Sequence, residues 1–449
     1  MKKLFVASLL LLCCTLTGKA QQNVTLYQMH DIVHASSLNP SVAPQRGWII
    51  GIPVLSNISL SARSSLSYNQ LGIDGNSINK DKLLSNLQDN NTFSLNGSIN
   101  VISIGYRNQK NFFQLSVNER FSTEFAISKA PLELLIKGNA GYGGQTVSGD
   151  FSINAYYYRE YAFNFAREID PTLWVGARAK LMFGRVGIKS TGNSLSLYTD
   201  PGSHDLTVSS NILANVYLPG TVTRDASDKI DGFDADFGFD DAGFNASNVG
   251  LGLDLGATKV FELLDRPLEV SASVLNLGYI GWNKNAHSFH QNGKMTLDGP
   301  YTSIDDIEVL TDTLRSFLDL DYANEKYRQG LAPTIMAGAN YSLNHFLNVG
   351  LTGMAEIRSA STPWAISATA FTRNLPVIDL GISYTISPNS YANIGYAMSL
   401  RLGGFNFYVV TDNILGAIKA SNARYMSAQV GMNIQFGKRY KSLSALLKE

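Results

Sequence analysis

The sequence predicts an all-β protein: a transmembrane antiparallel β-barrel of about 14 strands, with about 16 as the upper count, an N-terminal plug segment and a few short loop helices. Three observations predict it. Many segments alternate between apolar and polar residues, glycine and aromatic residues are abundant while charges are few, and no apolar run after residue 20 reaches the roughly 18 residues of a spanning helix.

The composition narrows the class of protein further. Charged residues make up 16% of the 449 residues, against about 25% in typical soluble domains, and 36 basic side chains balance 36 acidic ones. A hydrophobic fraction of 45% excludes a disordered chain. Nucleic-acid binding needs a basic face, so the balanced charge argues against a nucleic-acid partner.

Residues 1–20 have the pattern of a secretory signal peptide. Lys2 and Lys3 precede an apolar run and small residues end the segment, so we expect cleavage after Ala20. A retained anchor helix and a lipidated cysteine are the alternatives, but Leu12 rather than a small residue precedes the first cysteine. Both cysteines of the chain lie in this segment, so the mature protein would have no disulfide, thiol nucleophile or thiolate metal site.

The alternation assigns apolar and polar side chains to opposite faces, because successive residues of a strand point to opposite sides. In residues 173–184 one face is wholly apolar, and the other carries Arg178 and Lys180. Residues 249–258 and 426–436 repeat the pattern. Such strands build either a soluble sandwich with its apolar face inward or a membrane barrel with its apolar face outward.

Three features favour the barrel. Many runs have the length of about 9–11 residues that a tilted strand needs to cross a bilayer, and their polar faces are rich in Gly, Ser and Asn, as a lumen wall would be. Aromatic residues gather at strand ends, where interfacial girdles form, at 156–158, 161–165 and 405–408. Only a closed sheet leaves no unpaired edge in hydrocarbon, so we expect a closed cylinder in the outer membrane of a Gram-negative cell.

This reasoning divides the chain into a signal peptide (1–20), a plug-like N-terminal segment (21–47), an outer-membrane barrel (48–436) and a polar C-terminal tail (437–449). Turn residues place hairpins at 169–172, 344–345, 374–376, 387–389 and 403–404. The residue pattern predicts a short helix at 131–137, and helical spacing predicts a longer one at 303–320 that lies on or over the barrel mouth.

A long loop at 215–248 is rich in Asp and Phe. Asp234, Asp236 and Asp240 match three spacings of a calcium-binding loop, and carboxylates are ligands that Ca²⁺ prefers. The sixth position holds Phe239 instead of Gly, however, and the twelfth holds Asn instead of Glu. A solvated loop is therefore favoured over a calcium site, and no metal or cofactor is expected.

Catalytic and metal-binding motifs are weak elsewhere. His287 and His290 lie three residues apart without an adjacent carboxylate to complete a metal site. No Gly-x-Ser-x-Gly segment marks a hydrolase nucleophile. We therefore expect a protein that is not an enzyme.

Short motifs along the chain resemble those of known outer-membrane barrels. They are SLNPS (37–41), GIPV (51–54), DLG (254–256), VLNLGYIGW (274–282) and TDNILG (411–416). They are similar to segments of an uncharacterised family of Bacteroidota outer-membrane barrels, in the style of the PorV and PorP/SprF proteins of type IX secretion and of FadL-type transporters. The FadL-type resemblance implies a plug and a hydrophobic ligand, and the PorV-type resemblance implies docking of secretion cargo.

Two functions of different classes follow. The first is non-enzymatic: FadL-like passage or binding of a hydrophobic small molecule through a plugged lumen. The second is an accessory barrel of a type IX secretion or gliding-type assembly that binds partner proteins at its loops. An open porin is disfavoured by the expected plug. The expected partners are outer-membrane lipids with either the small molecule or secretion-system proteins. The candidate site residues are Asn39 and Pro40, as anchors of the N-terminal segment, with an ordinary turn before the first strand as the alternative.

Overall fold

The computed structural model describes most of the chain between residues 23 and 440. The described residues are 23–74, 77–190, 192–217, 220–224, 230–235, 248–283, 286–299, 321–323, 325–358, 361–373, 375–388 and 390–440. Three predicted segments lie outside them: the signal peptide (1–20), the helix at 303–320 and the end of the polar tail (441–449).

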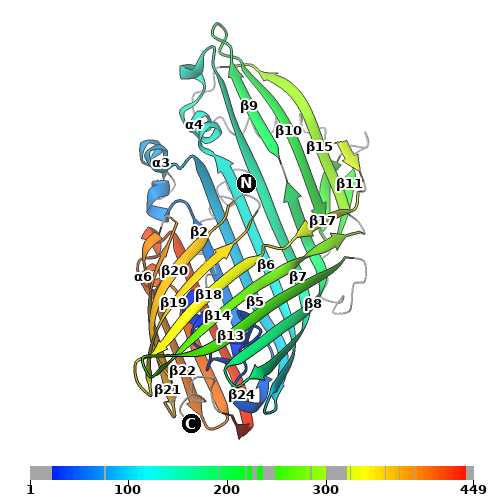
Figure 1. Cartoon of the computed structure of the whole chain (residues 1–449). Helices are drawn as coiled ribbons and strands as arrows, with labels where there is room; N and C mark the ends of the chain where they lie inside the picture. The colour runs from blue at the N-terminus through cyan, green and yellow to red at the C-terminus, as the bar shows by residue number, and fades with distance from the viewer. Residues whose placement is uncertain are drawn as a thin grey trace.

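The wall of the molecule is one antiparallel sheet that closes on itself (Figure 1). β1 (Arg46–Gly51) and β2 (Asn57–Ser64) are two parts of the first strand, and both pair with β5 on one side and with the last strand, β24, on the other. Successive pairing then runs through β5 (Asn90–Arg107), β6 (Asn111–Ser128), β7 (Thr146–Asp170), β8 (Leu173–Ser190), β13 (Val249–Leu263) and β14 (Arg266–Trp282). The ring is completed by β18 (Thr334–Ser342), β19 (Leu347–Glu356), β20 (Trp364–Thr372), β21 (Ile378–Ser387), β22 (Ser390–Leu402), β23 (Phe405–Thr411) and β24 (Tyr425–Arg439).

The upper part of the wall holds further strands. β9 (Asn193–Thr199) continues β8 along β7, and β17 (Tyr327–Gly330) continues β18 along β14. β10 (Leu206–Tyr217) pairs with the upper part of β8, and β15 (Ala286–Leu297) lies between β10 and the short β16 (Asp321–Ala323). Counting each interrupted strand once and leaving out β16, the described sheet has 16 strands. This number is the upper count that the sequence predicts.

The two ends of the barrel differ in their connections. Short turns join β5 to β6, β7 to β8, β13 to β14, β18 to β19 and β22 to β23 at the lower end in Figure 1. Longer connections at the other end contain two small hairpins, β3 (Ile73–Asp74) with β4 (Ser77–Ile78) and β11 (Gly220–Arg224) with β12 (Ile230–Ala235). They also contain η2 (Tyr68–Leu71), α3 (Lys80–Asn86), α4 (Lys129–Lys137), η3 (Ala140–Tyr142), α6 (Ile414–Ile418) and η5 (Ala420–Asn422). Outer-membrane barrels place their short turns in the periplasm, so the lower end is the periplasmic one.

The outer face of the wall is apolar, as the alternation predicts. Leu251 and Ile382 each leave 57% of their surface exposed, which only a lipid environment makes favourable over a whole band of the molecule. At the periplasmic rim the ring of Trp48 lies 4.6 Å from that of Tyr106 and 6.4 Å from that of Phe436, which forms part of an aromatic girdle. No helix among the described residues is long and apolar enough to span a membrane. A closed sheet with an apolar exterior is an outer-membrane β-barrel.

Some aromatic residues predicted for the girdle face the lumen instead. Tyr158 and Tyr408 are 3% and 0% exposed, and the rings of Tyr156 and Tyr158 lie 5.8 Å apart beside Trp282. The reason is the period of two: Tyr158 shares its face of β7 with Glu160, which is wholly buried in the lumen. A run of adjacent tyrosines therefore supplies both faces of the wall.

Residues 23–45, here called the N-terminal segment, lie inside the barrel. They contain α2 (Val24–Tyr27) and η1 (Val33–Ser37). Their apolar side chains pack against inward-facing wall residues in one buried core, which contains Val24, Leu26, Tyr27, Met29, Ile32, Ala35, Leu38, Val42, Leu275, Met336, Met354, Ala365, Phe371, Ala397, Tyr408 and Val410. This core fills the space between the segment and the wall.

Candidate functional site

Glycines of the wall make room for the N-terminal segment. A Cβ atom added at Gly176 would lie under 3.0 Å from the backbone of Pro40, and one added at Gly256 would lie as close to the Asn39 side chain. The same holds at Gly338 against the Gln28 side chain. Real Cβ atoms almost never approach other atoms this closely, and at Gly176 the nearest atoms belong to the backbone of Pro40 and Ser41, so there only glycine lets the segment sit so near the sheet.

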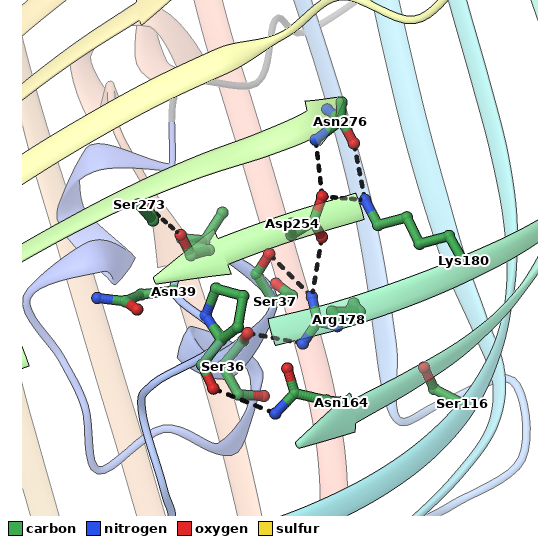
Figure 2. Close-up of polar contacts among 12 residues, drawn as sticks. Ser36, Ser37, Asn39, Ser116, Asn164, Arg178, Lys180, Asp254, Ser273 and Asn276 are labelled. Atoms are coloured by element: carbon green, nitrogen blue, oxygen red, sulfur yellow. Dashed lines mark hydrogen bonds and ion pairs between the residues drawn. The ribbon is translucent and has the colours of Figure 1, made fainter. Parts of the chain in front are cut away.

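Asn39 and Pro40, the predicted site residues, lie at the wall where β7, β8 and β13 meet. Asn39 Nδ2 donates to Thr258 Oγ1 at 3.3 Å and to the carbonyl of Ala257 at 3.4 Å, and its Oδ1 accepts from the Ser41 hydroxyl at 2.7 Å. The Pro40 carbonyl accepts from Asn164 Nδ2 at 3.2 Å (Figure 2). The turn therefore contacts three consecutive strands of the wall.

Arg178 binds the end of η1. Its Nη2 donates to the Ser36 carbonyl at 2.6 Å and its Nη1 to the Ser37 carbonyl at 3.1 Å (Figure 2). Carbonyl groups at the end of a helix lack partners within the helix, and a buried guanidinium supplies them. Ser273 completes the contact from β14, since its hydroxyl donates to the Leu38 carbonyl at 2.6 Å.

Arg178 is one of five charged residues that contact one another and are here called the lumen charge cluster. They are Arg120, Glu160, Arg178, Lys180 and Asp254. Asp254 lies 3.7 Å from Arg178 Nη1 and 2.7 Å from Lys180 Nζ, and Glu160 lies 3.8 Å from Lys180 Nζ and 3.2 Å from Arg120 Nε. Glu160 and Asp254 are wholly buried. Burying such charges is tolerable only when each is paired, so the cluster fixes the relative positions of β6, β7, β8 and β13.

A β-bulge brings one more side chain into this cluster. Asn276 has a φ of 60°, and the pairing of β14 with β13 shifts by one residue at this point. The shift turns Asn276 so that its backbone N–H donates to Asp254 at 2.7 Å and its Oδ1 accepts from Lys180 Nζ at 2.9 Å. Bulges re-aim side chains in this way near functional sites.

Asp412 holds the other end of the N-terminal segment. Its carboxylate accepts from the backbone N–H of Asn23 at 2.8 Å and of Thr25 at 3.0 Å, and from the Tyr425 hydroxyl at 3.0 Å. These amides open α2, whose first N–H groups have no partner within the helix. The carboxylate is buried, which strengthens each bond.

A second set of charges lies nearer the periplasmic end. His30 Nδ1 contacts Glu269, whose carboxylate lies 3.2 Å from Arg373 Nη1, and Arg373 Nε lies 3.8 Å from Asp31. Two of these residues belong to the N-terminal segment, Glu269 belongs to β14, and Arg373 lies in the connection from β20 to β21. Nearby, Arg107 donates to the Pro44 carbonyl at 2.7 Å. The segment is therefore fastened along its whole length.

A cavity of about 100 Å³ lies above the N-terminal segment. Its lining includes His34 and Leu38 of this segment, and it combines apolar side chains with charged ones. The apolar members include Leu38, Leu275, Met336 and Met354, and the charged members are Arg120, Lys180, Arg358 and Glu356. Three cations and one acid thus line the cavity, while the acids Glu160 and Asp254 lie behind the lining.

Arg358 closes the cavity from the connection that follows β19. It donates to Asn96 Oδ1 at 3.1 Å and lies 3.0 Å from Glu356. Burial lowers the pKa of Arg358, but the attraction of Glu356 and Glu124 outweighs it and raises the pKa above its ordinary value. The guanidinium is therefore a fixed positive charge at the cavity.

The calcium candidates fall mostly outside the described residues. Asp234 lies in β12, whereas Asp236 and Asp240 are not among them. His287 and His290 both lie in β15, and in the described part of the chain no group of three or more His, Cys, Asp or Glu side chains could hold a metal ion. The preference for a solvated loop over a calcium site therefore stays a prediction.

The lumen residues that sequence reasoning missed had a visible signal. Arg178 and Lys180 stood out on a polar face, and the segments DLG and TDNILG contain Asp254 and Asp412, yet none was named as a site residue. A charged residue that a plug buries against the lumen wall needs an opposite charge, and applying that rule to the polar faces would have marked them.

The chain was compared with curated proteins and with solved structures. Among curated proteins none matches the sequence. The fold is similar to the toluene transporter TbuX of Ralstonia pickettii (11% identity over 92% of this chain and 95% of that chain, TM-score 0.41) and to a FadL homologue of Pseudomonas aeruginosa (9%, 90% and 94%, TM-score 0.40). It is also similar to the translocator domain of the autotransporter NalP from Neisseria meningitidis (8%, 93% and 100%, TM-score 0.34).

Likeness at these identities and TM-scores carries no argument about function, so the case for one depends on this chain's own residues. A sequence model of the family DUF5723, described as a family of unknown function, matches residues 40–412 of the 449. The chain therefore belongs to the family DUF5723.

Proposed function

We propose that this protein is a plugged outer-membrane channel that binds a small amphipathic molecule in the lumen cavity and passes it inward when the N-terminal segment rearranges. The observation that carries the proposal is the cavity of about 100 Å³ whose lining includes residues of the N-terminal segment. The protein is not an enzyme on this proposal, because the cavity side chains serve to bind and to gate.

The composition of the cavity favours an amphipathic ligand over a purely hydrophobic one. Leu275, Met336 and Met354 offer apolar surface, but Arg120 and Arg358 lie in the same lining. A wholly apolar ligand would take water away from these charges without replacing its hydrogen bonds, which is unfavourable. With three cations against one acid, the lining favours a molecule that carries a negative charge on an apolar body.

The N-terminal segment acts as the plug in this proposal. Its contacts with Asp412 and with Arg178 lie on opposite sides of the lumen, so releasing one end leaves the other attached. Passage then needs a partial rearrangement beside the cavity, and full expulsion of the segment would expose the apolar core that it shares with the wall.

Uptake into proteoliposomes tests the proposal with two probes of fixed charge that do not cross a bilayer unaided. We expect hexanesulfonate to enter faster than hexyltrimethylammonium. We also expect hexanesulfonate to bind the detergent-solubilised protein in calorimetry, and the cavity-filling variant Met336→Trp to lose both signals. The matched control is Met398→Trp, because Met398 lies in β22 on the outer face of the wall.

Two outcomes would count against the proposal. Binding without uptake would retain the cavity site but exclude passage. Equal uptake of anion and cation, unaffected by Met336→Trp, would mean that the cavity selects nothing. Stoichiometric recovery of a secretion-system protein from native membranes, with no ligand bound, would instead support the accessory role that the sequence leaves open.

A further inference from the structure

An apolar groove with a volume of about 680 Å³ runs over the outer face of β18 to β22, the strands at the left of the barrel in Figure 1. Its lining includes small residues, among them Ala368 and Ala370, and larger apolar or aromatic side chains, among them Tyr341, Leu351 and Ile382. The groove therefore faces the membrane and is separate from the lumen cavity.

The register of the strands gives the groove a direction. Tyr341, Val349, Ala370 and Ile382 are successive partners in one row across β18, β19, β20 and β21, and this row begins at Leu268 of β14. Four strand spacings of about 4.8 Å make the row about 19 Å long. Because barrel strands tilt by about 40°, a row perpendicular to them climbs about 12 Å along the membrane normal, close to the depth of about 15 Å of one leaflet's hydrocarbon.

A cation lies at the lower end of this row. Arg266 is exposed and precedes Leu268 by two positions in β14, a rise of about 7 Å. Its Nη1 donates to the carbonyl of Leu343, in the turn that follows Tyr341, so the guanidinium is directed toward the end of the groove. Asp265 lies in the same hairpin as the acidic neighbour of Arg266.

We propose that this groove is a binding site for a phospholipid of the periplasmic leaflet, with one acyl chain along the row of Tyr341 and Ala370 and the phosphate at Arg266. The acyl chain matches the apolar lining, the length of the row matches one leaflet, and the phosphate matches the guanidinium, which binds such groups with paired hydrogen bonds. This inference does not depend on what the lumen cavity binds.

The groove also lies against the wall that holds the N-terminal segment. Gly350 and Ser383 line the groove from within the sheet, and on their inner side they meet Gln28 and Thr25 of the segment. One layer of backbone therefore separates a lipid in the groove from the segment.

Native mass spectrometry tests the proposal on the purified, delipidated protein. Phosphatidylglycerol is titrated in, and we expect one molecule to be retained while diacylglycerol, which lacks the phosphate, is not. The groove-filling variant Ala370→Phe should weaken retention about tenfold, since it displaces about two methylene groups of the chain. Arg266→Gln should abolish the preference for phosphatidylglycerol over diacylglycerol. The matched control is Ala337→Phe, an exposed alanine of β18 that does not line the groove.

The outcomes separate cleanly. Equal retention by Ala370→Phe and Ala337→Phe would overturn the site, and so would equal retention of the two lipids by the unaltered protein. A spectrum dominated by two copies of the chain, with the monomer restored by Ala370→Phe, would show a second copy in the groove in place of a lipid and would also overturn it. Because none of these readings involves hexanesulfonate, failure here is distinguishable from failure of the channel proposal.

Discussion

Replacing Gly176 by alanine tests whether the wall is shaped around the N-terminal segment. The added Cβ would lie under 3.0 Å from the carbonyl carbon and oxygen of Pro40 and from the backbone nitrogen of Ser41. These are backbone atoms, so no flexible side chain can move aside. The segment must shift away from β8, which stretches the hydrogen bond from Asn164 to Pro40 and the pair from Arg178 to the Ser37 carbonyl.

The magnitude follows from the added contact. Inserting a methyl group into a packed contact costs about 1–3 kcal/mol, and a single methyl group is the smallest such insertion, so we expect a cost of about 1–2 kcal/mol. Because β8 stays folded when the segment moves, the freedom of the unfolded chain does not enter this equilibrium. The fraction of molecules with a displaced segment should therefore rise about 5- to 30-fold.

A single cysteine can report this displacement. Both natural cysteines lie within residues 1–20, and Val42 is 5% exposed in the seated segment, so Val42→Cys supplies a buried thiol. Its rate of reaction with a water-soluble maleimide measures how often the segment opens, provided that opening and closing are faster than labelling. We expect the Gly176→Ala protein to react about 5 to 30 times faster than the parent.

Gly353→Ala is the matched control, because an added Cβ at Gly353 would have nothing within 4 Å. If the Gly176 and Gly353 variants react at the same rate, the close approach of Pro40 to the wall does not hold the segment, and the argument from the wall glycines is refuted.

Three further predictions concern carboxylates. Asp254→Asn removes the partner of two buried cations and should lower the free energy of unfolding by about 3–5 kcal/mol, measured by denaturant titration. Asp412→Asn replaces one of the two accepting oxygens by an NH₂ donor, and the remaining oxygen is expected to keep the side with the Asn23 and Tyr425 donors, so the Thr25 N–H loses its acceptor; the change should cost about 1–3 kcal/mol and speed hydrogen exchange at the Thr25 amide. The backbone N–H of Ser203 lowers the pKa of Asp200 in the hairpin between β9 and β10. The hydrogen bonds to the ionised Asp200 carboxylate stabilise the hairpin fully above the ordinary pKa of the carboxyl. This stabilisation is lost as the pH falls through the lowered pKa of the folded protein, so proteolysis of the hairpin should rise only at strongly acid pH.

Each of these predictions has its own control. Asp170→Asn at the end of β7, where the side chain is partly exposed, should leave the free energy of unfolding nearly unchanged, and a loss equal to that of Asp254→Asn would show that burial of the cluster is irrelevant. Unchanged exchange at Thr25 would exclude Asp412 as the holder of α2. The hairpin variant Asp200→Asn should lose the acid dependence, and a retained dependence would assign it to another group.

The alternation of the sequence predicts the wall because a strand leaves a side chain only two directions. It placed Leu251 toward lipid and Arg178 and Lys180 toward the lumen. A separate residue pattern at 131–137 predicted the short helix that the structure shows as α4. The alternation could not predict that Arg178 meets Asp254, because that depends on the register of β8 with β13. The long connection between β8, which ends at Ser190, and β13, which begins at Val249, does not fix how the two strands pair. A slip of one residue in the pairing would turn the side chains of one strand to the opposite face of the sheet.

The path of the N-terminal segment was equally hidden. Glycines on the polar faces predicted a lumen wall, but which glycine meets Asn39 depends on the course of a segment with no periodicity of its own. The bulge at Asn276 also had no separate signal, because its left-handed backbone arises from the mismatch between two strands. Periodic patterns thus specify surfaces, and contacts between surfaces need the fold.

The tie between Asn23 and Asp412 has a consequence for how the molecule is assembled. These residues are 389 positions apart, and the segment that begins at Asn23 leads directly into β1, which pairs with the last strand. Contacts so distant in sequence form only after the intervening chain is organised. The segment that precedes the wall in the chain is therefore among the last to find its place, and the step that closes the cylinder also encloses this segment.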